Sequence, residues 1–254
     1  MHGGPRLLDD KPQLQAHVAG FLYLVTILMG VYAEFFARGS LMVHGDPIAT
    51  AHNILNHETL YRFGLAADLI MSAAYIGVTV LLLVLLRPVD RLLSNLAAVF
   101  SIIGIAAIAA NSIVHAAVLV FITQRGSSIT SGPAEMNSIA YAFLRLHGQG
   151  YNIASVFFGF YCTLIGWLII RSGFLPRLVG GLMLIAGASF LVDSFAIIVT
   201  PTIGVYVDTY SSLASLIGEG ALTAWLLIFG IDVERWQKRK QRAVAGWNNP
   251  SPIG

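Results

Sequence analysis

Six ionisable side chains lie within otherwise apolar stretches of this sequence. They are two histidines and four carboxylic acids, namely Glu34, Asp68, His115, His147, Asp193 and Glu219. An ionisable group inside a bilayer is unfavourable unless it is paired or faces a protein-lined cavity, so these six predict a shared polar site. Imidazole and carboxylate groups can bind a cation, exchange a proton or coordinate a metal.

Helical spacing adds polar neighbours to these groups. Residues three or four positions apart share one face of a helix. By this rule Ser72 and Tyr75 accompany Asp68, Asn111 accompanies His115, Ser189 accompanies Asp193, and Ser215 accompanies Glu219. Small polar residues also suit close packing of helices in lipid, which explains the serines but not the four acids.

The acids differ in the partners available to them. Glu34 and Arg38 have the i,i+4 spacing of a local ion pair, which is an alternative to a role in the site. Asp193 and Glu219 have no basic residue within reach on their own helices. If they are ionised, they need a histidine, Arg62, a cation or a cationic substrate; otherwise they stay protonated and donate hydrogen bonds.

His115 and His147 are the candidate metal ligands. The spacings H-E-x-x-H, H-x-x-x-H and C-x-x-C are absent from the chain, so no motif names a metal. The same pair could hold haem, but we expect His147 at the membrane rim and His115 deeper, which disfavours that pairing. Cys162 should lie in the opposite half of the membrane, away from these bases. The cofactor therefore stays undetermined.

The composition is that of a membrane protein. Charged residues make up 11% and apolar residues 56% of the 254-residue chain, and the mean hydropathy is +0.74. The net charge of +2 gives no sign of nucleic-acid binding, and we expect none. A single cysteine excludes an intrachain disulfide.

The sequence contains six apolar runs, each near or above the roughly 20 residues that cross a bilayer as a helix. They cover approximately 18–37, 63–86, 92–123, 151–170, 177–199 and 210–231. We predict an all-α integral membrane protein, built as a six-transmembrane-helix bundle. Residues 18–232 form the membrane domain, between an N-terminal segment (1–17) and a basic tail (233–254).

The distribution of Lys and Arg predicts the orientation. Outside the apolar runs, eleven of these residues lie on the side of the two termini and four on the other side. Positive residues favour the cytoplasmic side, so both termini should be cytoplasmic. At 1.5 Å per residue, Glu34 then lies about 6 Å and Glu219 about 16 Å inside the outer boundary. We therefore expect an outward-facing polar pocket.

Two longer loops flank this pocket. In the loop at 38–62, Asp46 is placed to cap a helix that starts with Pro47 and lies flat over the pocket. The loop at 124–150 begins with RGSSITSGP and continues with YAFLRLH. This composition predicts a flexible stretch followed by a short interfacial helix.

Several segments resemble one known family. They are AEFFARGSL (33–41), GDPIATAHNIL (45–55), YRFGLAADL (61–69), LLRPVDR (85–91), FFGFYCTLIGWLIIRSGFLPR (157–177) and WLLIFG (225–230). The resemblance is to the bacterial membrane family catalogued as domain of unknown function 4386. It implies a six-helix protein of the bacterial inner membrane, and it brings no established activity, cofactor or catalytic residue.

Three functions are compatible with these patterns. The first is an outward-facing pocket that binds or transports a small molecule, cation or lipid headgroup. The second is an intramembrane enzyme that uses histidine and carboxylates, with or without a metal. The third is an accessory subunit of a membrane complex, which would require a partner chain. Lipid is the expected environment in every case, and the oligomeric state is open.

Overall fold

The chain folds into a bundle of long helices. The computed structural model describes residues 11–123 and 132–248, and these ranges contain no strand. The helices are α1 (Pro12–Val31), the π-helix η1 (Tyr32–Gly39), α2 (Pro47–Asn56), α3 (Glu58–Leu86), α4 (Arg91–Thr123), α5 (Pro133–Ser172), α6 (Arg177–Val199), α7 (Pro201–Ile228) and α8 (Val233–Asn248). Four of them begin with proline, whose fixed φ suits the first helical position.

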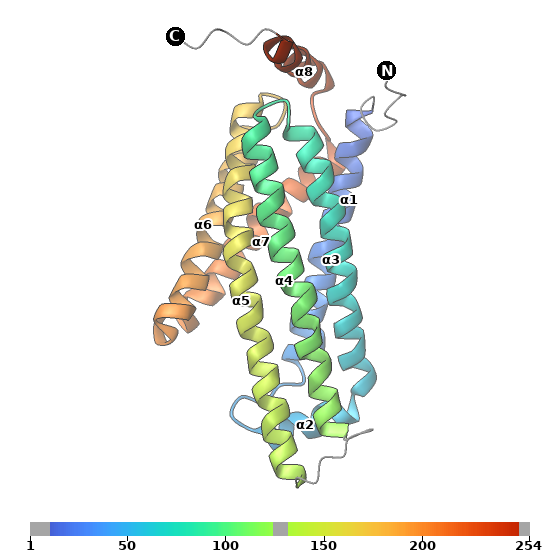
Figure 1. Cartoon of the computed structure of the whole chain (residues 1–254), viewed down its shortest axis with the longest axis vertical. Coiled ribbons are helices and arrows are strands. Elements are labelled where there is room, and N and C mark those ends of the chain that lie inside the picture. Colours follow the sequence, from blue (N-terminus) through green and yellow to red (C-terminus); the bar gives the residue numbers. More distant parts are fainter. Residues whose placement is uncertain (1–10, 124–131, 249–254) are drawn as a thin grey trace.

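Six of these helical segments are long and apolar enough to cross a membrane, which confirms the predicted bundle. They form a closed ring, in which α1 packs on α3, then α3 on α4, α4 on α5, α5 on α6, α6 on α7, and α7 again on α1 (Figure 1). The ring encloses the interior faces on which the polar residues lie.

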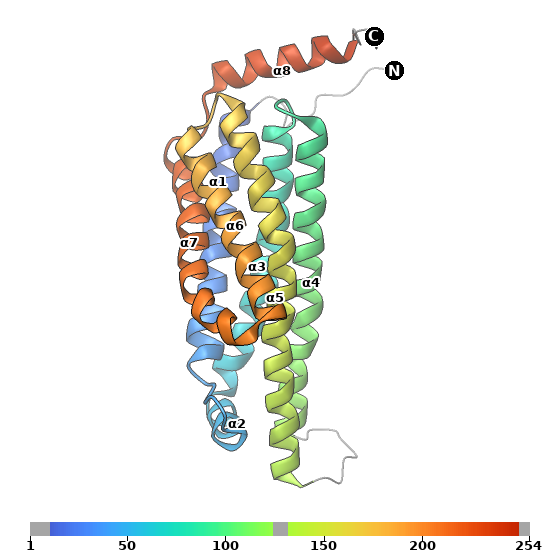
Figure 2. The ribbon, with the colours of Figure 1, turned by 90° about the vertical axis from the view of Figure 1, so that its left-hand side faces the viewer.

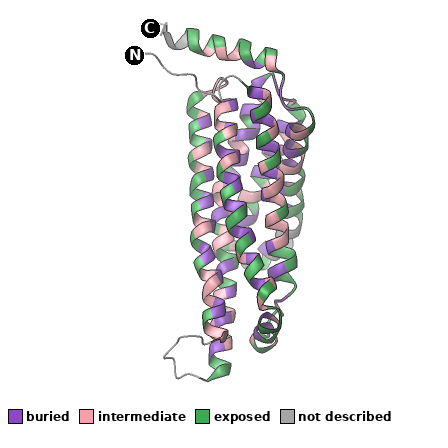
Figure 3. Cartoon of the chain, turned by 90° about the vertical axis from the view of Figure 1, so that its right-hand side faces the viewer, coloured by how far each residue is buried: buried purple, intermediate pink, exposed green. Residues whose placement is uncertain are grey.

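The outward faces of the ring are suited to lipid. Exposed residues recur along each long helix beside buried ones (Figure 3). Many of the exposed side chains are large and apolar, including Leu92, Ile113 and Leu178, each 74% exposed. Exposed apolar side chains of this kind are what a bilayer requires of a multi-pass protein.

The two ends of the bundle differ. Helix α8 crosses the end at which α1 starts, whereas α2 lies at the opposite end (Figure 2). The predicted start of α2 is confirmed, because Asp46 Oδ1 accepts a 2.9 Å hydrogen bond from the Ala49 amide and Pro47 follows it. Helices α6 and α7 turn before they reach the level of α2 (Figure 1).

The prediction for 124–150 is wrong in its second half. Residues 133–150 belong to α5, which runs without interruption from Pro133 to Ser172. The predicted flexible stretch at 124–131 lies outside the described residues. Gly150 does not break the helix, because its missing side chain makes room for the Asn111 amide of α4, against which any Cβ would collide. Tertiary packing thus overrides the low helix propensity of glycine here.

Candidate functional site

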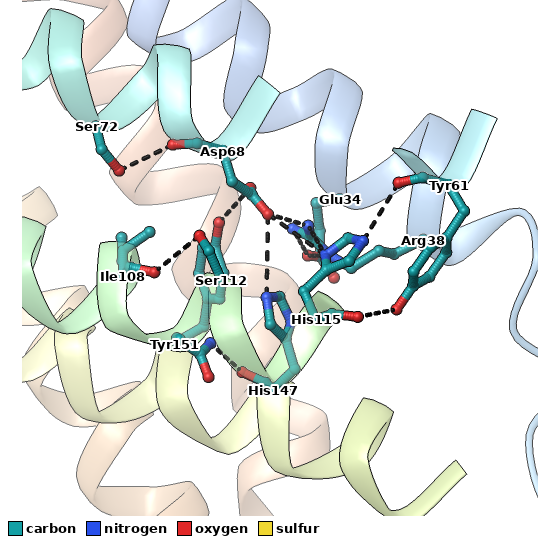
Figure 4. A network of polar contacts seen from close by, with 11 residues as sticks. Glu34, Arg38, Tyr61, Asp68, Ser72, Ile108, Ser112, His115, His147 and Tyr151 are labelled. Atoms are coloured by element: carbon teal, nitrogen blue, oxygen red, sulfur yellow. Dashed lines mark hydrogen bonds and ion pairs between the residues drawn. The ribbon is translucent and has the colours of Figure 1, made fainter. Parts of the chain in front are cut away.

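A buried polar cluster surrounds Asp68 of α3 (Figure 4). Its Oδ2 lies 2.5 Å from Arg38 Nη1, and its Oδ1 accepts a 2.6 Å hydrogen bond from the Tyr151 hydroxyl. His115 Nδ1 lies 3.7 Å and His147 Nε2 lies 4.0 Å from the same Oδ2. We call these residues, together with Glu34 and Tyr61, the Asp68 cluster. It joins η1, α3, α4 and α5.

Arg38 enters the cluster from the π-helical end of the first span. Its Nε and Nη2 donate to Glu34 Oε2 at 3.2 and 2.9 Å, so the predicted local ion pair forms. The Arg38 side chain is only 6% exposed, however, and its Nη1 reaches Asp68 as well. Its guanidinium carbon also lies 5.2 Å from the centre of the Tyr151 ring, within cation–π range. π-helical turns often occur at functional sites, and this one places a cation between two carboxylates.

His115 is held in one orientation by Tyr61. Its Nε2 donates to the Tyr61 carbonyl at 3.3 Å, while the Tyr61 hydroxyl donates to the His115 carbonyl at 3.1 Å. Because a carbonyl only accepts, the first contact assigns a proton to Nε2. In a neutral imidazole, Nδ1 then carries the lone pair and faces Asp68 and Arg38. Its distance to Arg38 Nη1 is 3.5 Å.

His147 lies well inside a helix rather than at the start of one. Helix α5 begins fourteen residues before it, and His147 is 2% exposed with its ring 5.2 Å from that of His115. The Asn111 amide donates to the His147 backbone carbonyl at 2.7 Å, which ties α4 to α5 beside the site. Its Nε2 is buried and has no hydrogen-bond partner among the described residues. Buried polar atoms without a partner are rare and call for an explanation.

Glu219 belongs to a second cluster, formed by α1, α3, α5 and α7. Its Oε1 accepts hydrogen bonds from the hydroxyls of Tyr23 at 2.8 Å and Tyr75 at 3.0 Å. Cys162 Sγ lies 3.6 Å from the same oxygen, so this thiol contacts one of the predicted acids. The predicted shared site is therefore divided into two clusters. Helix α3 contributes Asp68 to one cluster and Tyr75 to the other.

The other predicted residues lie around or outside these clusters. Ser72 donates to the Asp68 carbonyl at 2.8 Å, within the same turn of α3. Arg62 is 55% exposed and pairs with Glu58 rather than with a buried acid. Ser189 and Ser215 donate to carbonyls on their own helices, and Asp193 is buried on α6.

The sequence reasoning missed three tyrosines. Tyr61 and Tyr151 complete the Asp68 cluster, and Tyr23 completes the Glu219 cluster. Tyr151 follows His147 by four residues, so the two share a face of α5, as their ring separation of 5.2 Å shows. The predicted span begins at residue 151. The shared face would be recognisable from the sequence only for a helix that also includes residue 147.

Three residues of the Asp68 cluster could together hold a metal ion. Asp68, His115 and His147 each offer one ligand atom, and these three atoms lie within 4.8 Å of one another. The cluster is a packed interior rather than an open pocket, since Asp68 and His115 are completely buried. With neutral histidines, the buried charges of Arg38 and Asp68 cancel, and Glu34, whose side chain is 59% exposed, adds one negative charge at the edge of the cluster. Imidazole nitrogen and carboxylate oxygen are atoms that bind metal ions.

Two comparisons with known proteins found a match. An "Uncharacterized protein" from Archaeoglobus fulgidus is 27% identical over 161 residues, which are 61% of this chain and 76% of that protein. No solved structure matches the chain. A family model described as "Domain of unknown function (DUF4386)" matches residues 18–230, in agreement with the sequence motifs. The chain is therefore a member of the DUF4386 family.

Proposed function

We propose that this multi-pass membrane protein binds a small cation in the Asp68 cluster, and that the cation is a transition-metal ion. The ligands are Asp68, His115 Nδ1 and His147 Nε2. The observation that carries the proposal is the buried Nε2 of His147, which has no hydrogen-bond partner in the described part of the chain and lies 4.0 Å from Asp68 Oδ2.

The spacing of the three atoms supports a metal. Ligands at about 2.0–2.2 Å from one tetrahedral ion lie about 3.5 Å apart. The distances from Asp68 Oδ2 to the two histidine nitrogens are 3.7 and 4.0 Å, so sub-ångström shifts would bring them to that separation. Imidazole nitrogen with one carboxylate is a donor set typical of zinc, iron and similar ions rather than of magnesium or calcium.

The surroundings of His115 support the same assignment. A metal-ligating histidine usually donates its other N–H to a carbonyl or carboxylate, which fixes the ring and its tautomer. His115 makes that contact to the Tyr61 carbonyl at 3.3 Å. The Tyr151 hydroxyl likewise holds the second oxygen of Asp68.

The Arg38 guanidinium lies where the proposed cation would bind. Its Nη1 lies 2.5 Å from Asp68 Oδ2 and 3.5 Å from His115 Nδ1, between two of the proposed ligands. A metal ion must displace this nitrogen, because two positive charges repel at such distances. Glu34 already binds Arg38 through Nε and Nη2, so the guanidinium keeps a carboxylate partner when it leaves Asp68.

Thermal unfolding of the purified protein in nanodiscs tests this proposal. Metal should first be removed with a chelator, and zinc or magnesium then added. We expect zinc to stabilise the wild-type protein, by about 2.7 kcal/mol at a hundred times its dissociation constant, and magnesium to have no effect. His147→Gln should abolish the zinc effect, whereas the control His52→Gln, at an exposed position on α2, should retain it. An equal response of wild type and His147→Gln would overturn the proposal.

A second candidate function is catalysis at the same ion. Three protein ligands leave a coordination position for water or a substrate atom, as in catalytic zinc sites. Arg38 and the Tyr151 hydroxyl are polar groups that contact the proposed ligand Asp68. Hydrolysis that depends on added zinc and is lost in His147→Gln would favour the enzyme over a binding protein.

The charge distribution also supports a proposal for the orientation of the chain in the membrane. We propose a bacterial inner-membrane protein with both termini in the cytoplasm, because Lys and Arg are concentrated on that side of the spans. The proposed membrane domain is 18–232, with segment 1–17 before it and the basic tail 233–254 after it. The test is a C-terminal fusion to a reporter that is active only in the cytoplasm. The proposed orientation predicts that this fusion is active.

A further inference from the structure

A groove of about 370 Å³ lies far from the Asp68 cluster, at the end of the bundle that α8 crosses (Figure 2). It is formed where α5 turns into α6 and where α7 gives way to α8. Its lining includes Phe174, Pro176, Trp225, Phe229, Asp232 and Arg235. The volume is within the usual range of small-ligand sites.

One side of the groove is charged, because Arg235 and Asp232 line it and Arg177 adjoins it. Arg235 is 70% exposed, and its Nε and Nη1 contact Asp232 Oδ2 at 3.1 Å and the Gly173 carbonyl at 3.2 Å. These contacts fix the guanidinium at the groove and leave other N–H groups for a ligand. Arg177 follows the lining residue Pro176 and is exposed at the first position of α6. The positive end of α6 therefore adjoins the groove as well.

The other side is apolar and continues onto the outer surface of the bundle. Phe229 is 58% exposed, and its neighbour Ile228 is 68% exposed. Leu178, beside Arg177, is 74% exposed. A ligand that fits both sides has an anionic head and a hydrocarbon part.

Helix α8 adds positive charge at the same level. It carries Lys238, Arg239 and Arg242 beyond the groove. Trp236 anchors it to the bundle, since this side chain is 3% exposed and its indole N–H donates to the Leu85 carbonyl at 2.9 Å. A basic helix fixed across the end of a membrane bundle lies where lipid headgroups are.

We infer that this groove binds one anionic phospholipid of the leaflet on the α8 side. Arg235 and Arg177 contact the phosphate, and the first part of an acyl chain lies along Phe229 and Ile228. The inference is independent of the metal proposal, because the two sites share no residue.

The test uses the full chain in nanodiscs of phosphatidylcholine, with or without phosphatidylglycerol, and native mass spectrometry to count retained phosphatidylglycerol. We expect one tightly retained molecule per chain. Arg177→Gln should weaken its retention about fivefold, and Arg177→Gln with Arg235→Gln by more than tenfold. The matched control is Arg62→Gln, at an exposed arginine of α3 near the other end of the bundle.

Two further results decide the outcome. Phe229→Ala should also weaken retention, whereas glycerol phosphate without acyl chains should fail to compete at millimolar concentration. If glycerol phosphate competes fully, the site binds a free phosphate ester and the lipid assignment is wrong. Equal retention by the control and both arginine variants would also contradict it, provided that all variants keep the wild-type unfolding temperature without phosphatidylglycerol.

Discussion

Arg38 Nη1 lies 2.5 Å from Asp68 Oδ2, and this contact joins the π-helical end of the first span to α3 in a buried environment. The Asp68 side chain is completely buried and that of Arg38 is 6% exposed. Desolvating a charge is costly, so removing either residue would leave the other buried with an uncompensated charge.

Arg38→Met should therefore destabilise the protein strongly, by about 3 kcal/mol or more, because it leaves Asp68 buried without its cation. Adding Asp68→Leu should recover a large part of that loss. Unfolding in a denaturing detergent measures both effects. Arg62→Met, which removes an exposed pair with Glu58, should change stability by less than about 1 kcal/mol. An equal loss in Arg38→Met and Arg62→Met would refute the buried pair.

Tyr151→Phe should cost about 2 kcal/mol, because it removes a hydrogen bond to a charged, buried oxygen of Asp68. The ring and its contacts with His147 and Arg38 would remain. The same unfolding measurement applies. Tyr141→Phe is a control, since its hydroxyl makes an exposed contact with the Gly45 amide. If both tyrosine variants are as stable as the wild type, Tyr151 does not support Asp68.

Gly150→Ala should destabilise the contact between α4 and α5, although alanine is the better helix former. The added methyl group would overlap the Asn111 amide. Replacing Asn111 with alanine in the same chain should relieve the overlap, so the double variant should be more stable than the sum of the two changes predicts. Gly181→Ala is the matched control, because a Cβ at position 181 meets open space.

The clusters at Asp68 and Glu219 should behave as separate units. Tyr75 and Glu219 share a 3.0 Å hydrogen bond. The effects of Tyr75→Phe and Glu219→Gln on the free energy of unfolding should therefore couple by about 0.5 kcal/mol or more. Tyr151→Phe and Glu219→Gln belong to different clusters and should be additive. Double-mutant cycles measure both quantities. Strong coupling between Tyr151 and Glu219 would show instead that the polar interior is one network.

The architecture was predictable because each apolar run has about the length that a helix needs to cross a bilayer. The positions of Asp68 and His115 on interior faces followed from the period of the helix. The Asp46 cap at the start of α2 was equally readable, because its signal is local.

The composition of the site was not predictable to the same degree. His147 falls at a rim if Gly148 marks the outer end of the span, whereas α5 continues through Gly148 and packs Gly150 against Asn111. Arg38 looked like a surface partner of Glu34, since no local pattern shows that η1 turns its guanidinium inward toward Asp68. Long-range contacts between helices decide such cases, and the sequence of one helix does not contain them.

Equilibrium dialysis against cobalt, with elemental analysis and absorption spectroscopy, tests the central claim most directly. The wild-type protein in nanodiscs should bind one cobalt ion per chain with the spectrum of a low-coordinate nitrogen and oxygen site. His115→Gln and His147→Gln should lose that ion, and His52→Gln should keep it. Cobalt binding that is absent from the wild type, or unchanged in the His115→Gln and His147→Gln variants, would contradict the account.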